Sequence, residues 1–157
     1  MNVQNLWLMA GLPGSGKSTY ARTYAQTHND VVVVSRDDIR FRYIDNQKDY
    51  FKAEKTVFKE FIKEIQQALD EGHEVVIADA THLSNGSRVK TLNALKLDED
   101  IEVDLIVVNT PVELAKERNS LRTGLRRVPD DVIDSMATTF SWSENDSNFD
   151  YVKVITV

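Results

Sequence analysis

The 157-residue chain contains no cysteine, which excludes disulfide bonds, thiolate metal sites and cysteine nucleophiles. Long apolar runs are also missing, and none approaches the roughly 20 residues that a membrane-spanning helix needs. The N-terminus has no basic region followed by a long apolar stretch, so no secretory signal peptide is expected. These absences predict a cytoplasmic protein that does not enter the membrane.

An excess of positive charge is missing as well, because 25 acidic residues outnumber 19 lysines and arginines and give a net charge of −6. This balance argues against a broad, non-specific surface for nucleic acid. A nucleic-acid substrate would have to be held by a few local arginines. There is no repeat, low-complexity tract or linker, and 41 % of the residues are apolar, so residues 1–157 are expected to form one domain.

The most informative motif that is present is Gly-Leu-Pro-Gly-Ser-Gly-Lys-Ser-Thr at positions 11–19, which has the form G-x-x-x-x-G-K-[ST]. It follows an apolar run at 6–10 and precedes a helix-forming segment at 20–28, as a phosphate-binding loop requires. Backbone N–H groups of such a loop cradle phosphate oxygens at a helix N-terminus. The residues expected to bind ATP are Gly14, Ser15, Gly16, Lys17, Ser18 and Thr19.

Two of these side chains have distinct expected roles. Lys17 reaches the β- and γ-phosphates and assists catalysis, and the Ser18 hydroxyl is the expected ligand of Mg²⁺. A dinucleotide-binding G-x-G-x-x-G motif is excluded, because it would need glycine in place of Thr19.

Five apolar runs alternate with helical patterns, which predicts an α/β fold with a parallel sheet of five strands, flanked by helices on both faces. The run of four valines at 31–34 is expected to be buried on both faces. A long helix is predicted over 49–69, with its phenylalanines in the core rather than in a base-stacking platform. Thr110 is predicted to cap the next helix in a capping box with Glu113. The strands are expected at 6–10, 31–34, 74–78, 103–108 and 151–157.

Charged residues follow the second strand, at Ser35-Arg36-Asp37-Asp38-Ile39-Arg40. Ligands of open α/β sheets bind beyond the carboxyl ends of the strands, so this cluster is a candidate site. A kinase benefits from a carboxylate that accepts the proton of the attacking hydroxyl, and Asp37 is the candidate for this role. Arg40 is the candidate for holding a phosphate on the acceptor. Asp38 is the alternative candidate for accepting the hydroxyl proton, or else it caps a short helix.

The third strand ends in Asp79-Ala80-Thr81. Asp79 either acts through the water shell of the metal, or orients Arg40 in a bidentate pair, or caps the following loop. We place Asp79 and Thr81 on the acceptor side of the site. His82 is interpreted as a solvated loop residue without a ligand role.

A basic segment at 118–127 is interpreted as part of a small helical lid over ATP, spanning approximately residues 118–129. Arg118 and Arg122 are four residues apart, and on one helix they would repel each other unless an anion compensated them. Gly124 permits a tight turn there. Arg122 and Arg126 are the expected ATP-binding arginines, and Arg122 is expected to act on the transferring phosphoryl group.

Together these motifs resemble the 5′-kinase domain of bacteriophage-type polynucleotide kinases, within the P-loop kinase family. The resemblance runs from the first strand to about Met136. It implies a P-loop kinase fold and assigns Lys17 and Ser18 to the donor phosphates and Mg²⁺. It also implies that Asp37 is the general base on the 5′-hydroxyl, that Arg40 contacts the acceptor phosphate, that Asp79 supports the acceptor site, and that Arg122 is the lid arginine.

The leading hypothesis is an ATP- and Mg²⁺-dependent kinase that phosphorylates a hydroxyl, in particular the 5′ end of a single-stranded nucleic acid. An alternative is a kinase for a small-molecule acceptor, such as a nucleoside, a nucleotide or a sugar. A further alternative is a nucleotide-dependent switch or an ATPase. The sequence leaves the oligomeric state open.

Overall fold

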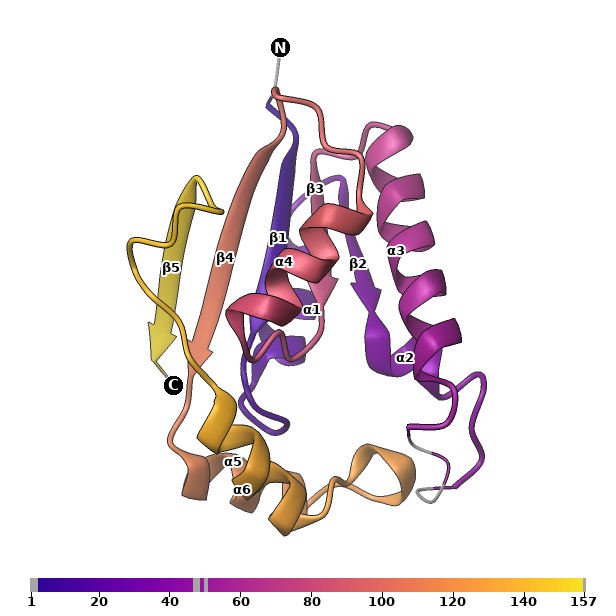
Figure 1. The fold of residues 1–157 in the computed structure, drawn as a ribbon, viewed down its shortest axis with the longest axis vertical. Coiled ribbons are helices and arrows are strands. Elements are labelled where there is room, and N and C mark those ends of the chain that lie inside the picture. Colours follow the sequence, from indigo (N-terminus) through magenta and orange to yellow (C-terminus); the bar gives the residue numbers. More distant parts are fainter. Residues whose placement is uncertain (1–2, 47–48, 50, 157) are drawn as a thin grey trace.

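The computed structural model describes residues 3–46, 49 and 51–156. Its five strands form one parallel sheet in the order β2-β3-β1-β4-β5 (Figure 1). The predicted five-stranded parallel sheet is confirmed, and each strand starts and ends within a residue or two of its expected bounds. The strands are β1 (Asn5–Ala10), β2 (Val31–Ser35), β3 (Val75–Asp79), β4 (Glu102–Asn109) and β5 (Tyr151–Thr156).

Helices cover both faces of the sheet, as predicted, and further helices lie beyond the carboxyl ends of the strands (Figure 1). One face is covered by α1 (Lys17–Thr27), and the other by α3 (Glu54–Asp70) and α4 (Asn85–Ala94). The helices at the carboxyl ends are α2 (Arg36–Arg40), α5 (Val112–Ser120) and α6 (Asp130–Thr139), with a 3-10 turn η2 (Gly124–Arg126) between the last two.

The two hydrophobic cores follow from the two-residue period of the strands. In β1, Leu6 and Leu8 are buried on the side of α3, where they belong to the same core as Phe61. Met9 points to the other face and shares a core with Ala21 of α1. Every strand of the centre is thereby buried on both sides, which holds the carboxyl ends of β1 and β3 in fixed positions.

Three local predictions were wrong. The valines of β2 are only partly buried, apart from Val34, because β2 is an edge strand. The long helix begins at Glu54 rather than at residue 49, and Phe51 lies before it with 64 % of its surface exposed. The capping position of α5 is Pro111, because the Thr110 hydroxyl donates a hydrogen bond to the Ser15 carbonyl 2.7 Å away instead of capping the helix.

Asp104 is a buried acidic residue near the start of β4. Its Oδ1 has no hydrogen-bond partner among the described residues. Burial raises the pKa of Asp104 to about 7, and a hydrogen bond with Glu102 and the negative charges of Glu102 and Asp150 act in the same direction. Between pH 3.8, the ordinary pKa of an aspartate, and about pH 7, Asp104 therefore stays protonated in the folded protein, whereas it is ionised in the unfolded chain.

We expect Asp104→Asn to raise the melting temperature at pH 8 and to have little effect at pH 4. A raised carboxyl pKa means that stability falls as the pH rises toward 7, and the amide removes this penalty. Thermal unfolding of both proteins at the two pH values measures the difference. Asp98→Asn, at an exposed site, is the matched control. An equal gain for Asp104→Asn at both pH values would contradict the assignment.

No helix within the described part of the chain is long and apolar enough to cross a membrane.

Candidate active site

The glycine-rich loop after β1 has the backbone geometry of a phosphate cradle. Gly14 and Gly16 have φ angles of +81° and +99°, a region that side chains with a Cβ rarely adopt. These two turns bring the chain directly into α1, whose N-terminal cap is Gly16. The first N–H groups of a helix have no partner within the helix, and they carry partial positive charge. The loop therefore presents donors to an anion at this point.

Neighbouring elements hold the loop in place. The Ser15 carbonyl accepts hydrogen bonds from the Thr110 hydroxyl at 2.7 Å and from Arg118 Nη1 at 3.2 Å. Thr110 follows β4, and Arg118 lies on α5. The basic residue at the start of the segment that we interpreted as a lid thus contacts the phosphate-binding loop.

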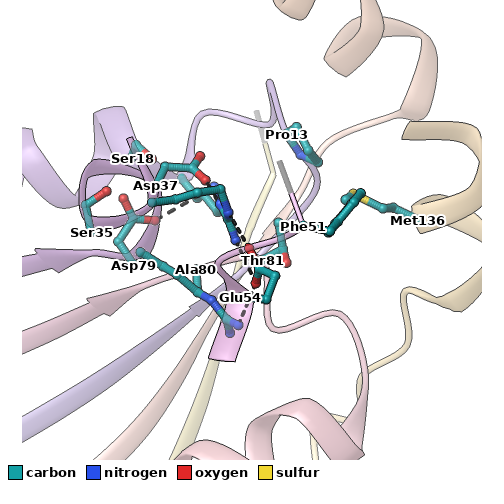
Figure 2. Close-up of a pocket in the computed structure, with 13 residues that line it drawn as sticks. Pro13, Ser18, Ser35, Asp37, Phe51, Glu54, Asp79, Ala80, Thr81 and Met136 are labelled. Atoms are coloured by element: carbon teal, nitrogen blue, oxygen red, sulfur yellow. Dashed lines mark hydrogen bonds and ion pairs between the residues drawn. The ribbon is translucent and has the colours of Figure 1, made fainter. Parts of the chain in front are cut away.

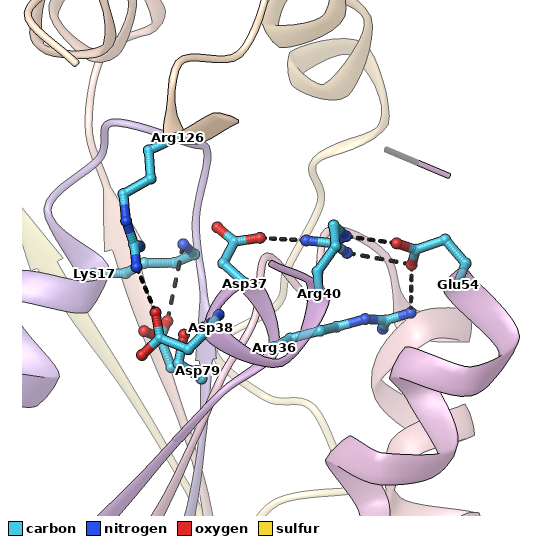
Figure 3. Close-up of polar contacts among 9 residues, drawn as sticks. Lys17, Arg36, Asp37, Asp38, Arg40, Glu54, Asp79 and Arg126 are labelled. Carbon is cyan, nitrogen blue, oxygen red and sulfur yellow. Dashed lines mark hydrogen bonds and ion pairs between the residues drawn. The ribbon is translucent and has the colours of Figure 1, made fainter. Parts of the chain in front are cut away.

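Lys17 and Asp79 face each other at the carboxyl ends of β1 and β3. Lys17 Nζ lies 3.8 Å from Asp79 Oδ1, and both side chains are more than nine-tenths buried (Figure 3). Among the described residues, Asp79 Oδ1 and the buried Ser15 Oγ have no hydrogen-bond partner. Buried polar atoms are normally paired, so these two atoms point to a ligand that completes the site.

A pocket of about 180 Å³ opens beside Lys17, at the carboxyl ends of β1, β2 and β3 (Figure 2). It brings together six residues that the sequence predicted to share a site, although they are up to 64 positions apart. These residues are Lys17 and Ser18, Asp37 and Arg40, and Asp79 and Thr81. The pocket is also lined by Pro13, Ser35, Arg36, Phe51, Glu54, Ala80 and Met136.

The residues from the second strand reach the pocket through α2, a single short helix. Ser35 caps it, since the Ser35 hydroxyl accepts a hydrogen bond from the Asp38 N–H at 3.2 Å. Asp38 is therefore not the cap. Asp37 and Arg40 lie three residues apart on one face, and Arg40 Nη1 donates to Asp37 Oδ1 (Figure 3). The helix thus directs a carboxylate and a guanidinium into the same pocket.

Glu54 is a pocket residue that the sequence did not reveal. Its carboxylate accepts hydrogen bonds from Arg40 Nε at 2.5 Å and from Arg36 Nη2 at 2.9 Å (Figure 3). Burial opposes ionisation of Glu54, but the hydrogen bonds and positive charges of Arg40 and Arg36 outweigh it and lower the pKa of this carboxyl. Arg40 pairs with Glu54 and Asp37 rather than with Asp79, so Asp79 does not orient Arg40.

Glu54→Gln is expected to raise the KM for an anionic acceptor about tenfold, because both arginines lose a charge-assisted hydrogen bond worth about 1.5 kcal/mol. The KM for ATP should stay the same, since the Glu54 carboxylate bonds to Arg36 and Arg40 rather than to a residue of the phosphate-binding loop. Steady-state kinetics with each substrate varied in turn separates the two effects. Glu60→Gln, on the same helix but outside the pocket lining, is the control. A rise in the KM for ATP alone would contradict this role for Glu54.

The segment that connects α5 and α6 contacts α2 and the residue after it through Arg126. Arg126 Nη2 donates to Asp38 Oδ1 at 2.7 Å, and the Arg126 guanidinium lies 5.0 Å from the centre of the Phe41 ring. The prediction that Arg118 and Arg122 share a helix was wrong, because α5 ends at Ser120. Arg122 does not line the pocket in this conformation of the described residues, and neither does Arg126.

A buried histidine, His82, attaches the loop after β3 to strand β1. Gly11 N–H donates to the Thr81 carbonyl at 3.0 Å, and His82 Nδ1 lies 2.8 Å from the Met9 carbonyl. Burial lowers the pKa of His82 to about 4, although the hydrogen bond to Met9 opposes this shift. His82 is therefore a neutral, structural residue rather than a solvated one. Arg88 Nη1 completes the anchor by donating to the His82 carbonyl.

These features define a class of protein. A glycine-rich phosphate loop after a central parallel strand, next to a carboxylate and two arginines, is the arrangement of a P-loop phosphotransferase. Residues 6–142 match the protein family described as AAA domain (AAA_33), and the chain belongs to this family. Solved kinases share the fold, so the P-loop kinase fold with its parallel sheet is confirmed.

Curated relatives are distant and act on different acceptors. The L-seryl-tRNA(Sec) kinase of Methanococcus maripaludis is 26 % identical over 166 residues, which cover 96 % of this chain and 60 % of that protein. A protein of Acanthamoeba polyphaga mimivirus named "Putative bifunctional polynucleotide phosphatase/kinase" is 29 % identical over 154 residues, covering 95 % of this chain and 32 % of its own length. This chain thus spans less than two thirds of either relative.

Solved structures give the same picture. A chain in the structure of the Pnkp1/Rnl/Hen1 RNA repair complex superimposes with a TM-score of 0.73 at 26 % identity, covering 96 % of this chain and 48 % of that one. A sugar kinase from Janibacter sp. HTCC2649 has a TM-score of 0.64 at 20 % identity, covering 99 % and 84 %. The second likeness shows the fold alone. The comparisons define a kinase-type phosphotransferase and leave its acceptor open.

P-loop kinases use ATP as the phosphoryl donor, usually with Mg²⁺, and the residues of this site fit both. Lys17 and Ser18 line the pocket beside the loop, where the phosphates would bind. No group of three or more His, Asp or Glu side chains suited to a metal occurs in the described ranges. Mg²⁺ often keeps several waters and takes few protein ligands, so Ser18 and Asp79 suffice for a metal held largely by phosphate oxygens.

Proposed function

We propose that this chain is an ATP-dependent kinase that transfers the γ-phosphoryl group of ATP to the 5′-hydroxyl of a polynucleotide. The observation that carries this proposal is that Asp37 and Arg40, on one turn of helix, line the same pocket as Lys17 and Ser18. A proton acceptor and a phosphate-binding cation therefore lie next to the donor site. One relative has the name "Putative bifunctional polynucleotide phosphatase/kinase", and one similar chain belongs to an RNA repair complex; both support this choice of acceptor.

The transfer proceeds by in-line displacement. The acceptor hydroxyl oxygen forms a bond to the γ-phosphorus, the bond from that phosphorus to the β–γ bridging oxygen breaks, and ADP leaves. Asp37 accepts the hydroxyl proton as the new bond forms. Lys17 balances charge on the β- and γ-phosphates, and Mg²⁺, when bound at Ser18 and Asp79, would neutralise further charge on the phosphate oxygens.

Two arginines on the acceptor side favour an anionic acceptor over a neutral sugar. Arg36 and Arg40 both reach the pocket, and Glu54 holds their guanidinium groups in a fixed orientation. Guanidinium groups bind phosphate oxygens in pairs, with defined geometry. A nucleotide with a 3′-phosphate next to its free 5′-hydroxyl meets this requirement.

We propose that residues 118–129 form a lid that closes when ATP binds and brings Arg122 and Arg126 onto the triphosphate. Arg126 leaves Asp38 when ATP supplies a stronger anionic partner, because the exposed pair of Arg126 and Asp38 is worth little in water. Arg122 then stabilises the charge that develops on the transferring group.

The test is incubation of the protein with γ-labelled ATP, Mg²⁺ and a panel of acceptors. The panel contains a 5′-hydroxyl oligonucleotide, a nucleoside 3′-monophosphate, a nucleoside and gluconate. Label on the oligonucleotide and on the nucleoside 3′-monophosphate supports the proposal. Label on gluconate or on the free nucleoside alone would assign a small-molecule kinase, and ADP release without any labelled acceptor would assign an ATPase.

A further inference from the structure

Helix α3 carries three lysines on one flank, although the protein as a whole is acidic. Lys55, Lys59 and Lys63 follow each other at four-residue intervals, so they share one flank. Lys59 and Lys63 line the groove between α3 and the end of α4. On the opposite flank, Glu64 lines a groove beside the edge strand β2. The lysines make the first part of this side of α3 positive, whereas the carboxylates of Asp70, Glu71 and Asp98 line the same groove further along.

Two further lysines of the α4 side complete this surface. Lys90 is on α4, and Lys96 follows its end and is tied to α3 by hydrogen bonds between its backbone and Gln66. All of these lysines are exposed, and none forms an ion pair with another residue in the described ranges. We call this set the basic flank; it consists of Lys55, Lys59, Lys63, Lys90 and Lys96.

The basic flank is continuous with the proposed acceptor pocket. Phe58, one turn after the pocket residue Glu54, lies between the two: the Arg36 guanidinium is 5.4 Å from the centre of its ring, and Lys90 Nζ is 4.5 Å from that centre. Figure 1 shows α3 and α4 side by side on the same face of the sheet, with the start of α3 next to α2. A chain of cations therefore leads from Arg36 in the pocket to the outer surface.

We propose that the basic flank binds the phosphate backbone of the polynucleotide acceptor, downstream of the nucleotide that carries the reacting 5′-hydroxyl. This inference rests on the proposed function. Lysines four residues apart on a helix are about 6 Å apart along its axis, which suits successive phosphates of an extended single strand. Asp70, Glu71 and Asp98 line the far end of the groove, and their negative charges limit the contact to a few nucleotides.

The pattern favours a nucleic acid over other anionic partners. The net charge of −6 opposes general adhesion to anionic surfaces, so the attraction is local and directed along one line. The line begins at the pocket that holds the acceptor end. A small-molecule acceptor would fill the pocket and never reach Lys59 or Lys63, so the basic flank predicts that long acceptors bind more tightly than mononucleotides.

The test compares the wild type with the triple variant Lys55→Gln/Lys59→Gln/Lys63→Gln. Binding of a fluorescent 5′-hydroxyl oligonucleotide of about 12 nucleotides is measured by anisotropy without ATP, over a range of salt. Loss of three phosphate contacts lowers the slope of log K against log salt by about 2, since each contact on a single strand contributes about 0.7. The KM for this oligonucleotide rises, whereas the KM for a nucleoside 3′-monophosphate does not.

The matched control is Arg22→Gln/Lys116→Gln/Lys153→Gln, which removes the same charge from other faces and should keep the wild-type slope. The proposal that the basic flank binds the acceptor is overturned if the salt slope of the triple variant is unchanged, or if the control variant loses as much of its salt slope. Equal rises in KM for both acceptors also overturn it. A wild type that labels neither nucleic acid nor nucleotide refutes the proposed function instead, so the two failures are distinct.

Discussion

Asp37→Ala is expected to lower kcat for phosphoryl transfer by about 10²- to 10⁴-fold, the usual contribution of a positioned general base. The affinity for ATP should change little, because the Asp37 carboxylate pairs with Arg40 rather than with Lys17 (Figure 3). The fold should survive, since Arg40 keeps its pair with Glu54 when Asp37 is removed. Single-turnover kinetics and nucleotide binding measure the two quantities separately.

The adjacent Asp38→Ala is the control for this variant. Asp38 is more than half exposed and pairs with Arg126 rather than with a pocket residue. Its loss should cost much less than tenfold in kcat. A larger loss of kcat for Asp38→Ala than for Asp37→Ala would mean that Asp38, and not Asp37, is the general base. A near-normal rate for Asp37→Ala would mean that Asp37 does not act as a general base.

Gly14→Ala should abolish productive ATP binding. A Cβ built on Gly14 would lie 2.2 Å from the Ala115 carbonyl oxygen and 3.2 Å from the Asn119 N–H, both of them backbone atoms of α5. Backbone atoms move only with the helix, so the phosphate-binding loop and α5 would have to separate. The substitution adds about 1–2 kcal/mol for the left-handed φ angle and about 1–3 kcal/mol for overpacking.

Gly72→Ala separates the two contributions. Gly72 has nearly the same φ angle, +83° against +81°, but a Cβ there meets no atom within 4 Å. It should lose only the cost of the backbone angle and should bind ATP normally. Chemical denaturation and nucleotide titration of both variants test this. Equal losses of stability in the two variants would show that α5 does not restrict the loop.

The architecture was predictable because its information is local. Alternating apolar residues and glycine-rich turns define β1, the phosphate-binding loop and α1 within about 20 adjacent residues, and buried strands need apolar runs wherever they occur. The predictions failed where a neighbour decides the outcome. The valines of β2 look like a central strand, but no strand pairs with their outer side within the sheet.

The candidate site was only partly predictable for the same reason. Asp37 and Arg40 can be recognised from the sequence, because they follow a strand and are three residues apart. Glu54 is one of several acidic residues on a long helix, and nothing in the neighbouring sequence distinguishes it. The lysines at 55, 59 and 63 have a visible four-residue period. Their link to the pocket depends on Phe58, Arg36 and Lys90, which come from three different elements.

By itself, the sequence determined a nucleotide-phosphate site and a parallel α/β sheet, because glycines, a lysine and a hydroxyl at fixed offsets act through backbone geometry that spans only a few residues. Tertiary structure alone decided that Glu54 orients Arg36 and Arg40, that Arg118 contacts the phosphate-binding loop, and that His82 is buried. These contacts join residues 14 to 103 positions apart, and only the packing of helices against the sheet brings such residues within hydrogen-bonding distance.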